Sequence, residues 1–346
     1  MEDKLNQLLD KITKLSQVSH LNFLFGSGAS DPFIPPQTNI EKNLDQALNE
    51  SNTDNEKKYK KEFFEKVIHP CIEIKDYTFT SSTDQHDNLT QSYTCYRNFL
   101  IEITKYILAR KSPLLNKQAN IFTTNIDIFF EKTLEDIGAY YNDGFIGHMK
   151  PIFRTSYYQT IIKKKSEYSE QQSEVPTFNL YKLHGSVTWE IQDRTLFFSD
   201  LSQITRIKDQ TNDGDFISEY NKLQIVNPNY QKFSSSVLAP TYYEMLRLYA
   251  SELEKENSVL FVLGFSFEDK HILEITRRAM DANPTLSVCI LCHSNTVKDN
   301  AKAKYQKKFE NIRYLNNLYY VEPKESEIID FDKAIELFLS KLNPNN

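Results

Sequence analysis

Three short motifs in this chain carry residue types that can bind phosphate, position a water molecule and move a proton. They are Gly26-Ser27-Gly28-Ala29-Ser30, Thr124-Asn125-Ile126-Asp127 and His184-Gly185, and each follows a short apolar run. In an open parallel α/β sheet, the carboxyl ends of the strands converge on one ligand crevice. The order of the motifs therefore predicts that a phosphate loop, an amide beside a carboxylate and a histidine meet at one edge of a sheet.

The glycine loop is the first of these motifs. The chain has 8 glycines, and two of them flank Ser27. A strand that ends in Gly-x-Gly and turns into a helix lets backbone amides approach a pyrophosphate, and the positive end of the helix adds attraction. A tight surface turn is the alternative interpretation. A dehydrogenase fingerprint would need a third glycine where the chain has Asp31, so the loop argues against hydride transfer.

Asn125 and Asp127 belong to the second motif. They have the same strand parity, so both side chains can face the crevice if the strand extends that far. Asn125 could hold a water molecule or a substrate amide without adding charge. Asp127 could orient its neighbours or stabilise a developing positive charge, or it could cap the next helix through an Asx turn. Both interpretations of Asp127 stay open.

His184 is the candidate general base, because histidine exchanges a proton near neutral pH. A lone histidine is more often structural, but this one precedes Gly185 at the end of an apolar run and follows the two other motifs in order. The other histidines lack such a context. His148, in Gly147-His148-Met149, could line the pocket through its proximity to the second motif.

The three motifs resemble those of the sirtuin family, whose NAD-binding domain carries a Gly-x-Gly-x-Ser loop, a Thr-x-Asn-x-Asp strand end and a His-Gly. The segment from Gly264 to Asp269 resembles the fourth family motif, a Gly-x-Ser after a later strand. The resemblance implies an NAD site in which Asn125, His184 and Asp127 are catalytic, and the matching histidine of sirtuins deprotonates a ribose hydroxyl. The residues that it implies in NAD binding are Gly26, Ser27, Gly28, Ala29, Ser30, Thr124, Gly185, Gly264 and Ser266.

The chain departs from sirtuin deacylases at three places. Gln37, Thr38 and Asn39 stand where the deacylase loop has Asp, Phe and Arg, and the interval from Val237 to Glu244 contains no recognisable peptide-docking strand. The paired Cys-x-x-Cys zinc knuckle is missing. Cys289 and Cys292 are three apart in an apolar run, which favours buried reduced thiols over a shared metal. We therefore expect neither zinc nor a required divalent metal.

These departures remove acyl-lysine recognition and leave the NAD pocket. The chain thus resembles the sirtuin-like branch of bacterial antiphage defence that hydrolyses NAD. Its length resembles the short form that works with a separate partner, commonly a HerA-type hexameric ATPase, and we expect a homo-oligomer. NAD glycohydrolase is the leading hypothesis. An NAD-dependent lysine deacylase and a non-catalytic sensor of NAD or ADP-ribose are the alternatives.

Composition limits the other partners. The formal net charge of −6 argues against a broad nucleic-acid surface, and we expect no direct nucleic-acid binding. Polar residues flank the run Lys163 to Lys165, which indicates a solvated loop. No apolar run reaches the length of a membrane span, and the start Met1 to Lys4 lacks the features of a signal peptide. We expect a cytoplasmic protein.

Apolar runs alternate with helical periodicity along much of the chain. The expected strands cover residues 21–25, 120–123, 179–184, 235–239, 258–263 and 286–291, and the expected helices cover residues 1–17, 242–255, 269–280 and 332–342. Continuous apolar strands between helices predict a parallel sheet covered on both faces, so the fold class is Rossmann-like, doubly wound α/β. Residues 190–234 fit neither pattern.

We expect one sirtuin-like NAD-binding domain over residues 1–346, with a helical insertion at residues 39–118. Within the insertion, residues 62–74 mix charged and apolar positions, and residues 96–109 place apolar side chains on one helical face. The insertion could be a mobile cover over the nucleotide crevice or a plain structural addition. The first helix is expected to pack on the sheet rather than to dock a partner.

Overall fold

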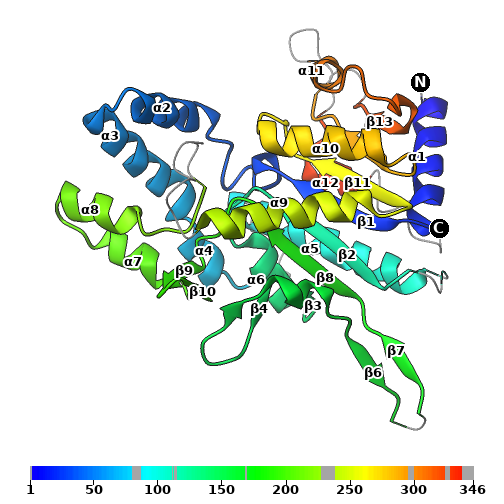
Figure 1. Cartoon of the computed structure of the whole chain (residues 1–346), viewed down its shortest axis with the longest axis horizontal. Helices are drawn as coiled ribbons and strands as arrows, with labels where there is room; N and C mark the ends of the chain where they lie inside the picture. The colour runs from blue at the N-terminus through cyan, green and yellow to red at the C-terminus, as the bar shows by residue number, and fades with distance from the viewer. Residues whose placement is uncertain are drawn as a thin grey trace.

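Seven parallel strands form the central sheet of the protein (Figure 1). The computed structural model describes residues 2–79, 87–110, 112, 115–167, 170–226, 238–294, 300–323 and 328–336. The strands of the sheet are β1 (His20–Phe25), β2 (Gln118–Thr123), β3 (Tyr140–Asn142), β8 (Thr177–Lys182), β11 (Ser258–Leu263), β12 (Ser287–Leu291) and β13 (Leu318–Val321). Their order is β13-β12-β11-β1-β2-β8-β3. This sheet confirms the predicted Rossmann-like fold class.

Helices cover both faces of the sheet. Consecutive side chains of a strand point to opposite faces, so an apolar strand presents apolar side chains to the helices on each face. On β1, Phe23 and Phe25 pack in one apolar core and Leu24 packs in the other. The first core includes residues of α1 (Glu2–Gln17), α5 (Asn88–Ala109), α6 (Phe129–Asp136) and α12 (Phe331–Ala334). The second includes residues of α9 (Leu238–Glu254) and α10 (Lys270–Ala282), and Tyr305 of α11 (Ala301–Lys308) packs against it. In Figure 1, α9 crosses in front of the sheet.

The order of the strands places a topological switch point between β1 and β11. From β1 the chain adds β2 and then β8 on one side, and it later adds β11, β12 and β13 on the other side. β1 and β11 pair along their whole length, from His20 opposite Ser258 to Phe25 opposite Leu263. Ligands of open α/β sheets bind outside the carboxyl ends of the strands at such a point. The fold alone therefore directs attention to the loops after Phe25 and Leu263.

A row of buried asparagines crosses the middle of the sheet. Asn22 of β1 is level with Asn120 of β2, which is level with Asn179 of β8. Asn120 Nδ2 donates to Asn22 Oδ1, and Asn179 Nδ2 donates to Asn120 Oδ1, each at 2.9 Å. Asn120 Nδ2 also donates to Glu252 Oε2 of α9, at 2.9 Å. The amides pair along the row in a region where an unpaired polar group is destabilising, and the row ends at Asn179 Oδ1, which has no hydrogen-bond partner within the described part of the chain.

The strands expected at residues 21–25, 120–123, 179–184, 258–263 and 286–291 are confirmed as β1, β2, β8, β11 and β12, although β8 ends at Lys182. The strand expected at residues 235–239 is wrong for Leu238 and Ala239, which begin α9, and residues 235–237 lie outside the described residues. The apolar run leads into helical spacing, with Tyr242, Met245 and Tyr249 buried. A short apolar run at a helix start resembles a strand in sequence.

Among the described residues between β1 and β2, the elements are helical. They are the 3₁₀ turn Ser27–Ala29, α2 (Thr38–Asn49), α3 (Thr53–Phe63), a π-helical turn (Phe64–Ile68), α4 (Cys71–Asp76) and α5. Within residues 62–74, the helical structure is interrupted before Pro70, which lacks the N–H group that a continuous helix needs. α5 packs on the sheet, where the Phe99 ring lies 5.1 Å from the Phe23 ring.

Within this helical segment, α3 contacts a second pair of helices, α7 (Ser202–Lys208) and α8 (Asp213–Tyr220). Lys60 Nζ donates to Asn221 Oδ1 at 2.7 Å, and Lys61 Nζ lies 2.5 Å from Asp213 Oδ1. Figure 1 shows α2, α3, α7 and α8 grouped beside the sheet. These helices form a lobe at one side of the fold, which we call the helical lobe.

Two small antiparallel sheets complete the fold. One contains β4 (Phe145–Ile146), β5 (Ile152–Phe153), β9 (Trp189–Gln192) and β10 (Thr195–Phe198), and the other contains β6 (Lys163–Lys165) and β7 (Gln172–Glu174). Short 3₁₀ turns cover Thr155–Gln159 and Leu315–Asn317. The solvated loop expected at Lys163 to Lys165 is instead an exposed strand, in which Lys164 Nζ lies over the Tyr140 ring. Antiparallel pairing with β7 places these three lysines in a strand despite the charge of the run.

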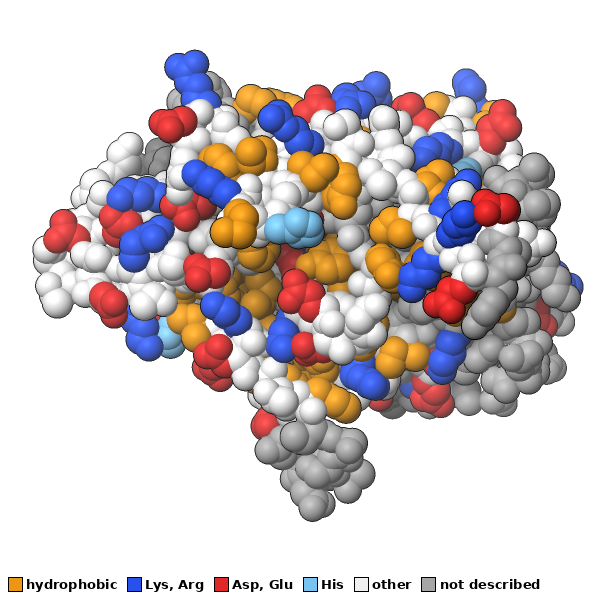
Figure 2. Space-filling view, turned by 90° about the horizontal axis from the view of Figure 1, so that it is seen from below, with side chains coloured by type: hydrophobic (Ala, Val, Ile, Leu, Met, Phe, Trp, Pro, Cys, Tyr) orange, Lys and Arg blue, Asp and Glu red, His pale blue; other side chains and the backbone are white. Residues whose placement is uncertain are grey.

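Several expected helices are present. α1, α9 and α10 cover most of the ranges predicted for them, and α12 begins at Phe331, although residues 337–342 of the last predicted helix lie outside the described residues. Within the described part of the chain, no helix combines the length and apolar character that a membrane crossing requires. Figure 2 shows one face of the molecule, on which Lys and Arg side chains are interspersed with Asp and Glu.

Candidate active site

The glycine loop and the fourth motif are packed directly against each other. Gly26 N donates to Leu263 O and Gly28 N donates to Gly264 O, both at 3.1 Å. A Cβ atom on Gly26 would lie 2.6 Å from Gly264 O, and one on Gly264 would lie 2.7 Å from Ala29 N. Gly264 also has φ +60°, a conformation that glycine adopts most readily. These glycines therefore allow two backbone loops to touch at the switch point.

The expected helix directly behind the glycine loop is not present. Ser27–Ala29 form a single 3₁₀ turn, and α2 begins only at Thr38. The N–H groups of Ala29 and Ser30 donate to the carbonyls of Gly26 and Ser27, at 3.0 and 3.2 Å. The Gly28 N–H is bonded to Gly264 O, so these three amides hydrogen-bond within the protein in this conformation. The sequence argument placed a helix end here because a Gly-x-Gly turn usually leads into one.

A cavity of about 250 Å³ lies at the switch point. Ser27, Gly28 and Ala29 line it from the glycine loop, and Gly264 and Ser266 line it from the fourth motif. The ionisable side chains along it are Asp31, His293 and Asp330, with Tyr305 nearby in the wall. Sequence reasoning missed these other than Asp31. The position of His293, two residues after β12, was the available signal, because ligand residues follow the carboxyl ends of strands.

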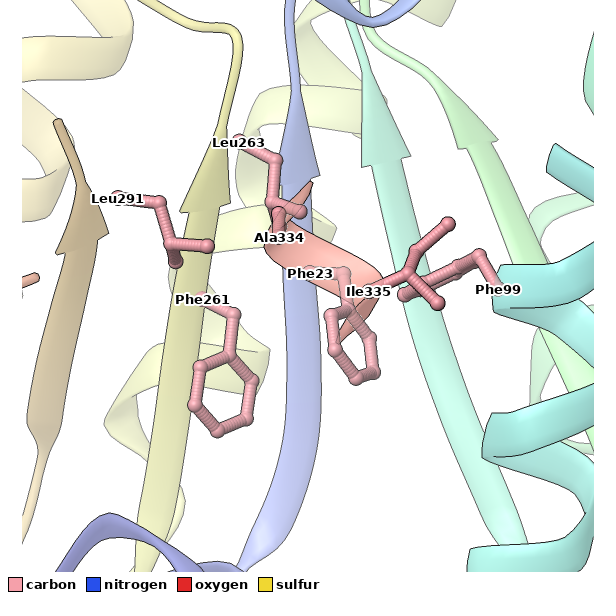
Figure 3. A pocket seen from close by; sticks show the side chains of 7 residues that line it. All are labelled: Phe23, Phe99, Phe261, Leu263, Leu291, Ala334 and Ile335. Carbon is pink, nitrogen blue, oxygen red and sulfur yellow. The ribbon is translucent and has the colours of Figure 1, made fainter. Parts of the chain in front are cut away.

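A second, smaller void of about 10 Å³ lies beneath α12 (Figure 3). Its lining is apolar, and it shares Leu263, Leu291 and Ala334 with the larger cavity. Figure 3 shows Ala334 and Ile335 over the strand that carries Phe23. A space of this size could barely hold a water molecule, and its lining offers no polar partner. It is a packing gap next to the larger cavity.

Asn125 belongs to a buried hydrogen-bonded group that we call the asparagine cluster: Ser30, Tyr96, Asn125 and Asp127. Asn125 Nδ2 donates to Ser30 Oγ at 2.9 Å, and Ser30 Oγ donates to Asp127 Oδ2 at 2.7 Å. The Tyr96 hydroxyl lies 2.9 Å from the same Oγ. Burial and the charge of Asp127 hold the pKa of Tyr96 well above its usual range. The cluster joins the first two motifs at the ends of β1 and β2.

The position of Asp127 bears on its two possible roles. β2 ends at Thr123, so Asn125 and Asp127 lie in a loop rather than on an extended strand. Asp127 Oδ1 accepts from Phe129 N at 3.2 Å, which is the Asx turn of the structural interpretation. Its other oxygen binds Ser30. Asp127 is 4% exposed and Asn125 is 8% exposed, so both face the protein interior in this conformation.

A buried lysine that sequence reasoning missed holds the same loop. Lys182, at the end of β8, is 3% exposed. Its Nζ donates to Asn125 O at 3.2 Å and to Asp127 O, and it lies 3.1 Å from Glu131 Oε1. Burial raises the pKa of Glu131 to about 7, although the charge of Lys182 acts in the opposite direction. The signal in the sequence was a lysine inside an otherwise apolar strand.

His184 lies two residues beyond β8 and forms what we call the histidine pair with Asp269. His184 Nε2 is 2.9 Å from Asp269 Oδ2. Burial acts to raise the pKa of Asp269, but the hydrogen bond and charge of His184, with two backbone N–H groups, lower it below its usual value. The charge of His184 also acts on Glu41 of α2. Sequence reasoning included Asp269 only as the last residue of the fourth motif.

The remaining predicted residues occupy separate positions. Thr124 N donates to Phe25 O at 3.1 Å, which joins the ends of β1 and β2. Gly185 has φ +79°, and a Cβ there would lie 2.1 Å from Gln224 O, so this glycine permits close packing of the segment behind His184. Ser266 lines the cavity. His148 is exposed in the connection between β4 and β5 and does not line the cavity.

All four cysteines are free and buried, including Cys289 and Cys292. Among the residues that the structure describes, no group of three or more His, Cys, Asp or Glu side chains could hold a metal ion. The buried thiols agree with the expectation for this pair.

Comparison with known proteins assigns the family. A search of curated proteins found no match. A family model described as a SIR2-like domain matches residues 119–315, which is more than half of the chain. The match includes Asn125, His184 and Asp269, whereas the glycine loop precedes it. The chain therefore belongs to the SIR2-like domain family, whose members use NAD.

Proposed function

We propose that the protein is an NAD glycohydrolase, which converts NAD⁺ and water into ADP-ribose, nicotinamide and a proton. The observation that carries the proposal is a histidine hydrogen-bonded to a carboxylate, His184 with Asp269, within a SIR2-like domain. Gly264 and Ser266 of the fourth motif line the cavity at the switch point, whereas Asp269 of the same motif and His184 do not line it. A histidine held by a carboxylate is an arrangement that can activate water for hydrolysis.

In the proposed reaction, Asn125 positions the attacking water and His184 accepts its proton. The water oxygen bonds to C1′ of the ribose, and the bond between C1′ and the pyridinium nitrogen breaks. Its electron pair stays on that nitrogen, so the cationic ring leaves as neutral nicotinamide. Because the leaving group is already cationic, this scheme needs no Lewis acid.

The binding residues of the proposal surround this reaction. The glycine loop Gly26 to Ser30, with Gly264 and Ser266, holds the dinucleotide beside the cavity. Thr124 and Gly185 belong to the same proposed set through the ends of β2 and β8. Asp127 acts on the site through Ser30, because its Oδ2 accepts a hydrogen bond from the Ser30 hydroxyl.

Two other functions remain alternatives. A lysine deacylase would need a peptide channel, and Gln37, Thr38 and Asn39 replace the deacylase Asp, Phe and Arg. A non-catalytic sensor of NAD or ADP-ribose would not need a base held by a carboxylate, so the histidine pair favours an enzyme.

We also propose the biological setting, which rests on the resemblance to defence sirtuins. The protein is an NAD-depleting effector of antiphage defence in the cytoplasm, it forms a homo-oligomer, and a HerA-type hexameric ATPase is its partner. The chain is a single domain in which residues 39–118 are a helical insertion, and it does not bind nucleic acid directly. In this proposal the isolated chain is nearly silent, because an unregulated hydrolase would drain the cell of NAD.

Incubation of the purified protein with NAD and an acetyl-lysine peptide tests the activity, alone and with the product of its neighbouring gene. Nicotinamide and ADP-ribose without deacetylated peptide support the hydrolase. Peptide-dependent nicotinamide release supports the deacylase. NAD binding by calorimetry without turnover, alone and with the partner, supports the sensor and would overturn the proposal.

A further inference from the structure

Asp269 divides its two carboxylate oxygens between a helix and a histidine. Oδ1 accepts hydrogen bonds from the backbone N–H groups of His271, at 2.8 Å, and Ile272, at 3.1 Å, at the start of α10. Oδ2 lies 2.9 Å from His184 Nε2. Because the helix cap fixes the first oxygen, it also fixes the direction in which the second oxygen points.

The segment before Asp269 is held in place independently of the histidine. Lys308 Nζ donates to the carbonyls of Ser266 and Phe267, each at 3.1 Å. Phe267 has φ +57°, an unfavourable conformation for a residue with a side chain, and its ring packs 5.0 Å from the Phe309 ring. A strained residue persists only where its surroundings determine it strongly. The carboxylate is therefore presented to His184 from a fixed backbone.

We propose that Asp269 is the positioning residue of the general base: it keeps a proton on His184 Nε2 and leaves Nδ1 to accept the proton of the attacking water. This inference rests on the proposed hydrolase function. A carboxylate only accepts hydrogen bonds, so the nitrogen that faces it must carry the proton. When Nδ1 takes the proton from water, the imidazolium is stabilised by Asp269, which stays ionised, and the proton then passes to solvent.

The surroundings of the histidine pair fit this role. The side chain of Asp269 is 10% exposed and that of His184 is 21% exposed, so the carboxylate is the more enclosed partner. The charge of His184 also acts on Glu41 of α2, and the Tyr242 ring lies 6.4 Å from the imidazole. Low local polarity strengthens a hydrogen bond between charged partners.

Asp269→Asn separates this role from the helix cap. Asparagine caps helices as well as aspartate does, so its Oδ1 can keep the N–H groups of His271 and Ile272. Its amide nitrogen then faces His184 Nε2 and donates to it. The neutral imidazole must then carry its proton on Nδ1, which is the tautomer that cannot accept a proton from water at that nitrogen. Asp87→Asn is a matched control, because exposed Asp87 caps α5 through Thr90 N.

The experiment combines ¹⁵N NMR of the imidazoles with steady-state kinetics and thermal unfolding of the full chain, in the oligomeric or partner-bound form that releases nicotinamide. The His184 signals are assigned with His184→Gln. We expect the Nε2–H tautomer in the wild type and the Nδ1–H tautomer in Asp269→Asn. We also expect kcat to fall about 10²–10⁴-fold with an unchanged KM and melting temperature. Asp87→Asn should match the wild type.

Two results would overturn the inference: an Nδ1–H tautomer in the wild type, or an Asp269→Asn variant that turns over at the wild-type rate. A raised KM with unchanged kcat would assign Asp269 to substrate binding and would also overturn it. If the wild type releases no nicotinamide in any form, the proposed function fails, but the wild-type tautomer still decides the orientation of His184. That measurement needs no variant, so a misfolded Asp269→Asn protein would not prevent the test.

Discussion

The asparagine cluster and the histidine pair both contain residues that follow the carboxyl ends of strands in the central sheet, but their surroundings differ. Asn125 is tied to Ser30 by its side chain and to Lys182 by its backbone carbonyl, and Lys182 is paired in turn with Glu131. The His184 side chain is hydrogen-bonded to Asp269, and its ring is more exposed. The asparagine cluster is thus held by several contacts, whereas the His184 side chain is held by its contact with Asp269. The difference suggests a fixed group for positioning and an accessible group for proton transfer.

The strongest test of this contrast compares His184→Ala with Asn125→Ala. Each removes a proposed catalytic group, so we expect nicotinamide release to fall by about 10²–10⁴-fold in both. Each variant also removes a hydrogen bond, but Asn125→Ala leaves its gap in the more enclosed region, so we expect it to lower the free energy of unfolding further than His184→Ala does, by about 1 kcal/mol. Turnover assays and denaturant unfolding measure the two effects. Near-normal turnover in either folded variant would contradict the mechanism, and equal stability losses would contradict the contrast.

The second test addresses the lysine beneath the asparagine cluster. Lys182→Met leaves Glu131 buried without its cation, so we expect a loss of about 3–5 kcal/mol in the free energy of unfolding. Lys182→Met combined with Glu131→Leu should recover much of that stability, because it removes both charges. Lys165→Ala is the control, since Lys165 forms an exposed ion pair with Glu170 that contributes little. A Lys182→Met protein as stable as the control variant would show that the ion pair does not support the cluster.

The third test addresses the contact between the glycine loop and the fourth motif. Gly264→Ala introduces a positive-φ alanine and a Cβ 2.7 Å from Ala29 N, whereas Gly138→Ala introduces only the positive φ, since Gly138 has φ +65° and open space around it. We expect Gly138→Ala to lose about 1–2 kcal/mol of stability and Gly264→Ala to lose more, with weaker NAD binding. Unfolding curves and calorimetry provide the comparison. Equal losses with unchanged binding would separate the contact from the site.

The last test is a pH dependence within the enclosed region. Burial raises the folded-state pKa of Glu131 from 4.5 to about 7, so the folded protein binds its proton more tightly than the unfolded chain does. The stabilising contribution of that proton is complete below about pH 4.5 and is lost as pH rises to about 7. Relative to Glu131→Gln, the wild type should therefore lose stability across this window. Urea unfolding at several pH values measures the difference, and a constant difference would contradict the buried titration.

The sequence predicted the sheet well because its strands are continuous apolar runs, such as Ser258–Leu263, which have few alternatives in a chain of this kind. It also placed Asn125 just beyond one strand and His184 at the end of another. It did not predict Tyr96 or Lys182 as their neighbours, because these come from a helix and a strand whose approach depends on tertiary packing. The partnership of Asp269 with His184 spans 85 positions of sequence. The false strand at Leu238 shows the limit of short apolar runs, which helices also contain.

The asparagine row across β1, β2 and β8 bears on how reliably the chain reaches this arrangement. A shift of one residue between neighbouring strands would displace the following loops by about 3.3 Å. Such a shift between β1 and β2 would separate Ser30 from Asn125, whose hydrogen bond is 2.9 Å long. It would also leave the amides of Asn22 and Asn120 opposite apolar neighbours, and a buried unpaired amide costs about 1–3 kcal/mol. Parallel sheets form slowly, and intermediates with a shifted register are destabilised by these unpaired amides. The row therefore favours the native register, on which a site at the ends of the strands depends.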